Sequence, residues 1–321
     1  MHKLDGLDVF FEGIAKAAEL SNRVEEGDYL GEDGLLYCHH CGTPKQCKVE
    51  NPFIEGRIDT RFCLCKCKAE KAEQERIERE CYELELEYDK AKYRSTSNSD
   101  LLDWLNRQKY KISPRLTKER TSLMRDICFG IDIEMKNWTF ENADGSNKTL
   151  MTAAKNYVEH FQDFKEQGKG LLLFGDVGVG KSYAAASIAN ALIDKNVGVY
   201  MTNFARIADI VQGLFEGRQE YYDSLNRFPL LILDDLAAER KTEYMQEIVF
   251  KVIDARSRAG LPLIITTNLT NNEIKNPSEM AYKRTFSRLL GMCHPIEVNG
   301  TDKRKSKLVA DFQNTKNLLG I

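Results

Sequence analysis

The sequence predicts an α/β fold in which a parallel β-sheet is covered by helices on both faces. Two observations predict it. In the carboxy-terminal half, short apolar runs alternate with helical patterns, and a glycine-rich turn joins the first run to its helix. Strands buried on both faces read as continuous apolar runs, and alternating strands and helices build parallel sheets. We expect strands at 170–174, 197–202, 230–234, 261–267 and 295–298, and helices at 150–167, 182–193, 204–215, 243–259 and 279–291.

The glycine-rich turn reads Gly-Asp-Val-Gly-Val-Gly-Lys-Ser and fits the phosphate-binding pattern G-x-x-x-x-G-K-[S/T]. Its glycines let the backbone turn sharply and bring N–H groups to phosphate oxygens, and the following helix offers its positive end to the same anion. Lys181 is expected to reach the β- and γ-phosphates and the Ser182 hydroxyl to bind Mg²⁺. A chance match is the alternative, but the strand before and the helix after the turn argue against it. The predicted nucleoside-triphosphate site is formed by Gly175, Asp176, Val177, Gly178, Val179, Gly180, Lys181 and Ser182.

Two further predicted strands end in polar residues that suit phosphate chemistry. The run 230–234 carries four apolar residues and then the carboxylates Asp234 and Asp235. The carboxyl ends of parallel strands meet at one edge of the sheet, so Asp234 is expected beside the glycine-rich turn, where it can hold Mg²⁺ through water. Asp235 can orient or deprotonate the attacking water. The strand 261–267 leads to Asn268, which can hydrogen-bond the γ-phosphate or that water.

A predicted helix near the carboxy terminus carries Arg284 and Arg288 four residues apart, so both side chains share one helix face. An arginine that enters the nucleotide site of a neighbouring subunit stabilises the charge that develops on phosphate. Composition alone favours the alternative, a pair of surface arginines. The spacing leaves both interpretations open.

Length and composition limit the class of protein. A chain of 321 residues suffices for two domains. The net charge of −3 provides no overall basic footprint for nucleic acid, although local patches remain open. The sequence has no run of eighteen apolar residues and no signal-peptide pattern at its start. We therefore expect a soluble, cytoplasmic protein without a membrane partner.

Six of the nine cysteines fall within residues 38–67. In a chain without a secretion pattern, this clustering indicates metal binding rather than disulfides. The segment Cys-x-x-Cys-Gly, which begins at Cys38 and continues through Cys41, predicts a turn in which two thiolates hold one ion. A second thiolate pair about twenty residues further on completes a tetrahedral site. The sequence thus predicts a structural zinc ion, because the segment around the cysteines is too short to fold on a hydrophobic core without a bound metal.

The second pair of zinc ligands can be chosen in more than one way. We favour Cys65 and Cys67, because Cys67 opens the next predicted helix and is stabilised as a thiolate by the helix end. Cys63 is the alternative ligand. His39 and His40 are further candidates, and a set of free thiols is the alternative to a metal site.

The rest of the amino-terminal region has mainly helical patterns. Residues 3–30 are amphipathic, which is typical of a packing helix and is also compatible with a docking surface. Residues 68–94 carry apolar residues at alternating steps of four and three on a charged background, which predicts a helix that packs within the chain or on a partner. Ser99 and Asp100 are expected to cap the next helix. Residues 115–137 form a connector with a mixed pattern.

These motifs together resemble one known family. The glycine-rich turn, Leu-Asp-Asp-Leu-Ala-Ala-Glu-Arg at 233–240, Thr-Thr-Asn-Leu at 266–269 and Arg-x-x-x-Arg at 284–288 resemble the AAA+ ATPases of the DnaC/IstB type. The resemblance is greatest to DnaC-like (DnaI-like) replicative helicase loaders of bacterial chromosomes, phages and mobile elements. The segment C-x-x-C-G-T-P-K-Q, the later C-x-C and the charged helix are similar to the amino-terminal region of the Gram-positive members. The resemblance covers 138–310 and, less fully, 35–95.

The resemblance implies an AAA+ P-loop NTPase that uses ATP and Mg²⁺ as a switch and carries Zn²⁺ in a small α-rich amino-terminal domain. It implies that this domain grips a hexameric replicative helicase, and that the AAA+ domain binds single-stranded DNA and associates with further copies. Carried over by position, the family's roles fall on Walker A (Gly175, Gly178, Gly180, Lys181, Ser182), Walker B (Asp234, Asp235), sensor 1 (Asn268), the arginine finger (Arg288, then Arg284) and a late basic residue (Arg304).

The expected organisation has three parts. A partner-binding domain occupies 1–115, with the zinc module at about 38–67 and the charged helix at 68–94. A connector at 116–137 precedes the AAA+ domain at 138–321.

The expected activity is slow hydrolysis of ATP, stimulated by DNA or by the partner. The second Walker B acid is an Asp, one methylene shorter than the Glu common in AAA+ proteins, which suits slow turnover. Two other functions remain open. One is a transposition ATPase of the IstB type that acts on a transposase and duplex DNA, and the other is an adaptor that binds ATP with negligible turnover.

Overall fold

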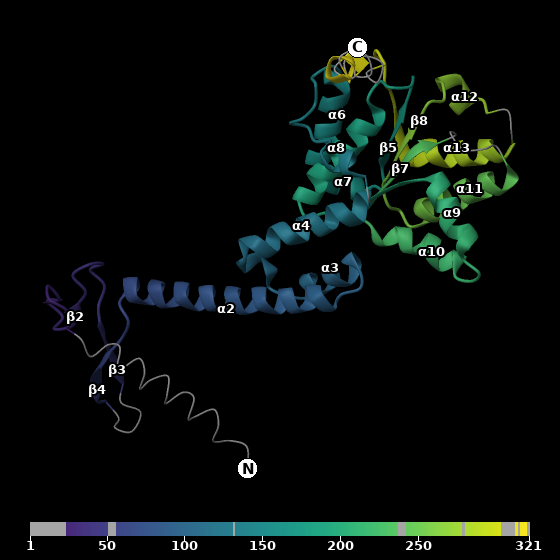
Figure 1. Ribbon diagram of the computed structural model, residues 1–321. Helices are drawn as coiled ribbons and strands as arrows, with labels where there is room; N and C mark the ends of the chain where they lie inside the picture. Colours follow the sequence, from purple (N-terminus) through teal and green to yellow (C-terminus); the bar gives the residue numbers. More distant parts are fainter. Residues whose placement is uncertain are drawn as a thin grey trace. The chain divides into compact units, whose positions relative to one another are not determined.

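The computed structural model of the chain divides into two compact units, Met1–Lys90 and Ala91–Ile321, and each is described by itself. Figure 1 shows the ribbon coloured along the sequence. Among the described residues, no helix combines the length and the apolar character needed to cross a membrane. The structure describes residues 24–50, 56–130, 132–236, 242–277, 280–302, 312–313 and 315–319.

The described part of the first unit opens with two antiparallel hairpins that the sequence patterns did not predict. β1 (Tyr29–Leu30) pairs with β2 (Leu36–Tyr37). β3 (Gln46–Glu50) pairs with β4 (Ile58–Phe62) over its full length. The cysteine-rich segment is therefore built on short strands, although we expected an α-rich module.

The helix predicted at 3–30 is wrong in its last part, and its first part lies outside the described residues. Glu26 and Gly27 form a turn that leads into β1. Gly27 has φ 99°, a left-handed conformation that ends helical geometry and that glycine adopts without a steric penalty.

The predicted charged helix is confirmed as α2 (Lys66–Arg94), which begins two residues earlier than predicted and ends at the predicted residue. The next helix, α3 (Asn98–Asn106), begins earlier than its predicted cap at Ser99 allows. Its N-cap is Ser97, whose Oγ accepts a hydrogen bond from the Asp100 amide at 3.1 Å. A serine caps this helix, as predicted, but it is Ser97 and not Ser99.

The connector with a mixed pattern contains real helices. After a 3₁₀ turn, η1 (Tyr110–Ile112), come α4 (Pro114–Phe129) and α5 (Ile133–Lys136). Ser113 caps α4, accepting a hydrogen bond from the Leu116 amide at 3.1 Å, and proline occupies the first turn. α4 belongs to the second unit, because its buried side chains Met124, Cys128 and Phe129 join the core beside the sheet.

A five-stranded parallel sheet forms the centre of the second unit, as the alternating pattern predicted. Its strands are β5 (Gly170–Phe174), β6 (Val199–Asn203), β7 (Leu230–Leu236), β8 (Leu263–Thr267) and β9 (Cys293–Glu297). The strand order is β6-β7-β8-β5-β9. β8 therefore lies between β7, which carries the paired carboxylates, and β5, which leads into the glycine-rich turn.

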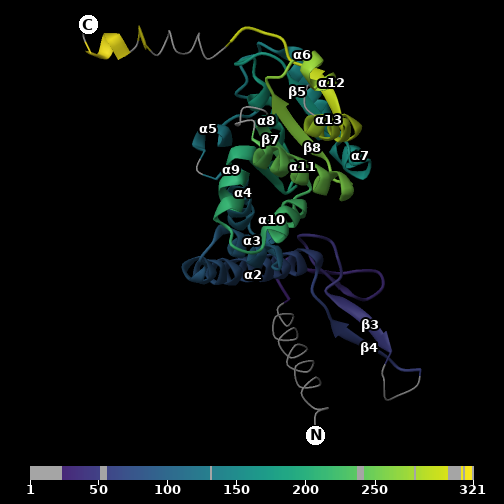
Figure 2. The ribbon, with the colours of Figure 1, turned by 90° about the vertical axis from the view of Figure 1, so that its right-hand side faces the viewer.

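Helices cover both faces of this sheet (Figures 1 and 2). They are α6 (Lys148–Glu159), α7 (Phe161–Glu166), α8 (Lys181–Asp194), α9 (Phe204–Gly213), α10 (Arg218–Ser224), α11 (Glu243–Arg258), α12 (Asn271–Lys275) and α13 (Met280–Met292), with a 3₁₀ turn η2 (Leu225–Arg227). One apolar cluster joins α4, α6 and α8 to one face of the sheet, and the other joins α9, α11 and α13 to the opposite face. β5 shows the alternation: Leu171 and Leu173 enter the first cluster, and Leu172 and Phe174 enter the second.

Candidate nucleotide-binding site

The glycine-rich turn directly follows β5 and ends in the first turn of α8. Gly175, Gly178 and Gly180 all have positive φ, at 133°, 79° and 101°. Two of them also have no room for a side chain. A Cβ at Gly175 would collide with the Val298 carbonyl oxygen, and one at Gly178 would collide with the Asp302 carboxylate. The backbone path of this turn therefore requires glycine at these positions for conformational and for steric reasons.

The three intervening residues of the turn differ in their surroundings. Val179 is buried in the apolar cluster that contains α8, and it anchors the turn to the core. Asp176 and Val177 are exposed. They carry the turn around the space in front of the helix N-terminus.

Lys181 is buried and lies across the mouth of the turn. Its Nζ donates hydrogen bonds to the carbonyl oxygens of Gly175 at 2.8 Å and Asp176 at 2.6 Å. It also donates to Asn268 Oδ1 at 2.8 Å, although 87 residues separate the two in sequence. The ammonium group is thus held at the junction of the β5 turn and the end of β8.

Asp234 and Ser182, the two predicted Mg²⁺ ligands, lie near each other, and the Ser182 hydroxyl lowers the pKa of Asp234. Thr266 Oγ1 donates to Asp234 Oδ1 at 2.6 Å. Burial raises the pKa of Asp234, the two hydroxyl groups lower it, and the nearby charge of Asp235 raises it further. Partial burial and the neighbouring acid disfavour the ionised form of Asp234, and a bound cation would stabilise that form. This fits a role in Mg²⁺ binding.

Asp235 lies where β7 leaves its regular pairing with β8, since the register between the strands shifts between Leu233 and Leu236. The backbone of Asp235 is left-handed, with φ 63°. Its amide donates to Thr266 Oγ1 at 2.9 Å, and its Oδ1 accepts from Asn268 Nδ2 at 3.3 Å. The Asp235 side chain is thereby turned out to solvent and fixed next to Asn268.

Thr266 is the residue of this site to which the sequence assigned no role. Its hydroxyl accepts from the Asp235 amide and donates to the Asp234 carboxylate, so it orients both acids. A hydroxyl at the penultimate position of a buried strand, opposite the acid-bearing strand, is the signal that could have identified it. That signal becomes useful only once β7 and β8 are known to be neighbours.

The two arginines of α13 do not join this network among the described residues. Arg288 Nη1 pairs with Asp254 Oδ1 of α11 at 2.7 Å, and its guanidinium lies over the Phe250 ring at 4.6 Å. Arg284, one turn earlier, is exposed and makes no salt bridge with a described residue. The structure therefore distinguishes the two arginines by their anchoring.

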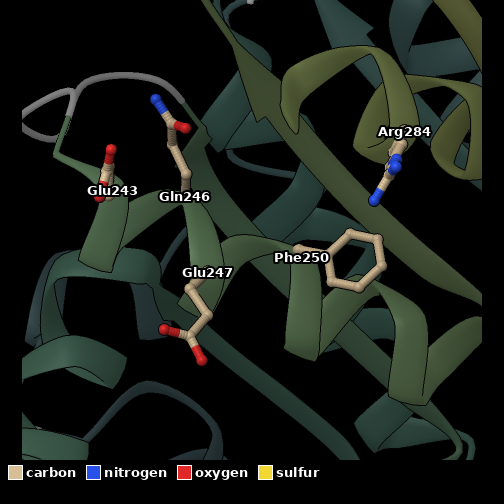
Figure 3. Close-up of a pocket in the computed structure, with 5 residues that line it drawn as sticks. All are labelled: Glu243, Gln246, Glu247, Phe250 and Arg284. Carbon is tan, nitrogen blue, oxygen red and sulfur yellow. The ribbon is translucent and has the colours of Figure 1, made fainter. Parts of the chain in front are cut away.

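Arg284 extends into a cleft of about 370 Å³ between α11 and α13, as the close-up in Figure 3 shows. The other lining residues, Glu243, Gln246, Glu247 and Phe250, all come from α11. Among the described lining residues, Arg284 alone comes from α13. The cleft is open and mixed in polarity, and no part of the glycine-rich turn lines it.

The four favoured cysteines are brought together in the first unit. The Sγ atoms of Cys38, Cys41, Cys65 and Cys67 all lie within 4.8 Å of one another. The Cys65–Cys67 and Cys38–Cys67 sulfur separations are 3.4 and 3.8 Å. A tetrahedral zinc with Zn–S bonds of about 2.3 Å requires sulfur separations of about 3.8 Å, so the cluster fits zinc in size and donor type.

The hydrogen bonds of the cluster support metal binding. The Thr43 hydroxyl lies 3.0 Å from Cys41 Sγ and lowers the pKa of this thiol to about 6. Cys67 has its pKa raised to about 12, mainly by its contact with the Cys65 sulfur. Sulfurs this close to one another favour sharing one cation over carrying separate charges.

The alternative ligands lie outside the cluster. The Cys63 Sγ donates to the Pro44 carbonyl oxygen at 3.6 Å. The rings of His39 and His40 lie with their centroids 3.9 Å apart and their planes tilted by 38°, and His39 bonds Asp28. Neither these histidines nor Cys63 belongs to the set of four sulfurs.

A second group, Glu25, Asp28 and His39, also brings possible metal ligands together. Here the buried Lys45 ammonium already supplies the positive charge, since it bonds Asp28 and lies 2.9 Å from Glu25 Oε2. The hydrogen bonds from Lys68 and Lys45 lower the pKa of Glu25 to about 2. This group is an ion-pair cluster rather than a cation site.

Two parts of the predicted motifs lie outside the described residues. They are Ala-Ala-Glu-Arg at 237–240, which follows the Walker B acids, and Arg304.

The chain is similar to a family of ATP-binding proteins. Residues 77–310 match the family model described as IstB-like ATP binding protein. The replicative helicase loader DnaI of Bacillus subtilis (strain 168) is 28% identical over 203 residues, which cover 58% of this chain and 64% of DnaI. The chain thus spans less than two thirds of the length of that relative.

A second relative and one structure complete the comparison. An insertion sequence ATP-binding protein of Sinorhizobium fredii (strain NBRC 101917 / NGR234) is 41% identical over 107 residues, which cover 32% of this chain and 35% of that protein. A crystal structure of DnaI superposes with a TM-score of 0.47 at 24% identity, over 56% of this chain and 98% of that one.

Proposed function

This chain belongs to the IstB-like ATP-binding protein family, and from that premise we propose that it is an ATP-dependent loader of a replicative helicase. In this proposal the chain binds ATP and Mg²⁺, associates with further copies, and helps place a hexameric helicase on single-stranded DNA. ATP binding and slow hydrolysis act as the switch. The Bacillus subtilis relative is a replicative helicase loader, which supports the choice of partner.

The observation that carries the proposal is one polar network at the ends of three adjacent strands. Asn268 bonds both Lys181 and Asp235, and Thr266 bonds both Asp234 and Asp235. A phosphate-binding lysine, a half-buried acid and an exposed acid are thereby fixed relative to one another before any ligand binds. Such preorganisation is what phosphoryl transfer needs from a protein.

Each group has a specific task in ATP hydrolysis. The backbone amides of the glycine-rich turn bind phosphate oxygens, and Lys181 exchanges its loop carbonyl partners for the β- and γ-phosphates. Ser182 and Asp234 would hold Mg²⁺, which neutralises phosphate charge. Asp235, exposed and fixed by Asn268, accepts the proton of the attacking water or orients that water.

The remaining assignments extend this proposal to partners. We assign the contact with the helicase to the amino-terminal domain at 1–115, in which a structural zinc held by Cys38, Cys41, Cys65 and Cys67 gives the module its shape. Because α4 packs into the core beside the sheet, we assign most of the segment 116–137 to the same unit as the AAA+ domain at 138–321, and Arg288 serves a neighbouring copy's nucleotide site. Single-stranded DNA binding belongs to the AAA+ domain.

The direct test is a pull-down of the tagged protein from a bacterial lysate with ATP, followed by identification of the retained proteins. We expect a hexameric replicative helicase to be retained by the wild type, and to be lost or strongly reduced with Lys181→Ala. Lys118→Ala removes an exposed lysine of α4 and is the matched control. If the wild type retains no replicative helicase in ATP, the loader function is wrong.

A second measurement separates the loader from an adaptor with negligible turnover. Asp235→Asn keeps the shape of the side chain and removes the acid. A true ATPase should lose turnover about 100-fold or more while its ATP affinity stays within about twofold. Turnover of the wild type that is unchanged by single-stranded DNA and by this substitution would favour the adaptor.

A transposition ATPase is the second candidate function. The 41% identity to the Sinorhizobium fredii protein over 107 residues supports it. This candidate predicts that a transposase, and not a helicase, is retained in the same pull-down, and that duplex DNA stimulates turnover more than single-stranded DNA does. The cysteine module favours the helicase loader, because it is similar to the amino-terminal region of Gram-positive loaders.

A further inference from the structure

On the surface between α11 and α13, Arg288 is held by two contacts, whereas its neighbour Arg284 forms no salt bridge with any residue that the structure describes. Phe250 and Asp254 are four residues apart on α11, so they lie on one helix face. The ring stacks on the Arg288 guanidinium and the carboxylate pairs with its Nη1. The Arg288 side chain remains 42% exposed, so the grip fixes its direction without covering it.

Asp254 also pairs with a second guanidinium group, that of Arg258. Arg258 Nη2 lies 2.9 Å from Asp254 Oδ2. The Asp254 side chain is only 14% exposed, whereas that of Arg258 is 73% exposed. One carboxylate therefore serves two guanidinium groups, each through its own oxygen.

A free arginine loses much rotamer freedom when it enters a site, and a preorganised one loses less. Arg288 is already ordered by two contacts, whereas Arg284 makes no salt bridge with a described residue. From this difference we propose that Asp254 is a positioning residue that, with Phe250, orients Arg288 toward the nucleotide site of a neighbouring copy. This inference rests on the shared site of the proposed function.

The test uses mixtures of two inactive variants of the full chain. The receiver is Arg288→Ala, which keeps an intact nucleotide site. The donor is Lys181→Ala, which keeps its arginines but has a disabled site. Mixing them should restore ATP turnover that neither variant shows alone, because the donor supplies Arg288 in trans.

Asp254→Asn is then added to one partner at a time. On the donor it should lower the restored turnover by on the order of ten- to a hundredfold, as expected for a misplaced catalytic group. On the receiver, which has no Arg288 to hold, it should leave the restored turnover unchanged. In the otherwise wild-type chain, the same substitution should lower kcat and leave the Kd for ATP within about twofold.

Controls separate positioning from stability. Arg258→Ala removes the other partner of Asp254 and should leave the restored turnover of the mixture within about twofold. Asp254→Glu on the donor should recover part of the loss, since it keeps a carboxylate. Each variant's melting temperature is measured, so that a fall in turnover caused by unfolding is recognised.

The outcomes distinguish the inference from its premise. If mixing restores no turnover, the shared site of the proposed function fails, and the inference fails with it. If mixing restores turnover but Asp254→Asn acts equally on donor and receiver, or on neither, the shared site stands and the positioning role of Asp254 is overturned.

Discussion

In the unit Ala91–Ile321, two apolar clusters cover the two faces of a parallel sheet. In the described part of Met1–Lys90, the buried apolar side chains are Tyr88 and the cysteines Cys38 and Cys65. The first arrangement is stabilised by burial of large apolar area, whereas the second has too little of it to fold by burial alone. The two units therefore depend on different interactions, and conditions that remove one set should leave the other unit intact.

The units also differ in how they bury a cation. Lys45 of the first unit lies among carboxylates, pairing with Glu25 and Asp28. Arg256 of the second unit is fully buried, pairs with no carboxylate in the described part of the chain, and donates to backbone carbonyls. The buried Lys45 is neutralised by carboxylates, whereas the buried Arg256 is satisfied by backbone carbonyl groups. This difference again follows the amount of apolar surface that is buried around each cation.

The largest expected effect is that of metal removal. Chelation of zinc, which contributes on the order of 10 kcal/mol to the folding of comparable modules, should unfold the cysteine module and leave ATP binding within about twofold. The measurement combines zinc content, limited proteolysis and ATP affinity on the full chain. Cys63→Ser is the matched control and should keep one zinc per chain, whereas Cys65→Ser should lose it. Proteolysis that is unchanged after chelation would contradict the conclusion that the first unit depends on a bound metal.

The next largest loss, inside the second unit, should come from its buried guanidinium. Arg256 donates to the Pro262 carbonyl oxygen at 3.1 and 2.9 Å, to Pro229 at 3.0 Å and to Leu225 at 3.3 Å. Arg256→Met should lower the free energy of unfolding of this unit by about 3–5 kcal/mol, because three carbonyl groups lose a partner where water does not reach.

Urea unfolding measures this loss. The zinc content should not change, since the substitution lies in the other unit. The exposed Arg258→Met, on the same helix, is the control and should shift stability by less than about 1 kcal/mol.

A smaller effect, confined to chemistry, is expected at Asn268. Asn268→Ala removes the amide that joins Lys181 to Asp235. Turnover should fall about 100-fold, or about 3 kcal/mol, while ATP affinity changes less than tenfold. Steady-state hydrolysis and nucleotide titration measure the two quantities. Loss of affinity with unchanged kcat would show that Asn268 serves binding rather than the reacting groups.

The smallest effect concerns Asp234, whose pKa is raised by burial. A carboxyl group with a raised pKa in the folded state favours folding while it is protonated, and that contribution is lost as pH rises through the folded pKa. At neutral pH the ionised group therefore destabilises the ligand-free protein. Asp234→Asn should raise the melting temperature at pH 7 by about 2–4 °C, and the gain should shrink toward pH 4.

Mg²⁺ and ATP provide the control for this prediction. In the presence of ATP, Mg²⁺ should stabilise the wild type more than it stabilises Asp234→Asn, because the substitution removes the ionised oxygen that would help to bind the cation. A melting temperature that falls in the variant at pH 7 without ligand would contradict the sign of the effect.

Much of the second unit could be predicted from sequence because its elements follow regular patterns. β5 is a continuous apolar run, and α8 begins at the lysine of a motif that fixes the strand, turn and helix around it. The one large omission there, α4, has a physical cause. Arg120 occupies a buried position on this helix, so the apolar periodicity is interrupted by a residue that normally faces solvent.

Ser113 and Pro114 illustrate another limit. A serine followed by proline is typical of a break between helices, but in the structure the serine caps α4 and the proline opens it. Ser113 and Pro114 end one element and begin the next. Whether a helix follows them depends on the buried contacts of the residues further along the chain.

The site could be predicted where one motif holds its residues and could not where strands must first be paired. Lys181 and Asp234 were placed from the order of strands and loops. Thr266 joins the two acids only because β7 and β8 are neighbours, and Asp254 meets Arg288 only because α11 packs on α13. These contacts depend on tertiary arrangement, which local patterns in the sequence do not contain.

The left-handed backbone at Asp235 limits which side chains this position can tolerate. Asp and Asn adopt φ near 63° more readily than Glu or β-branched residues do, and the conformation still carries strain on the order of 1 kcal/mol. Substitution by Glu would lengthen the acid and at the same time disfavour the turn that presents it, while Gly would relax the turn and remove the acid. A comparison of Asp with Glu here therefore changes the backbone as well as the reach of the acid. An engineer who wants a faster ATPase would have to redesign the turn after β7 together with the residue.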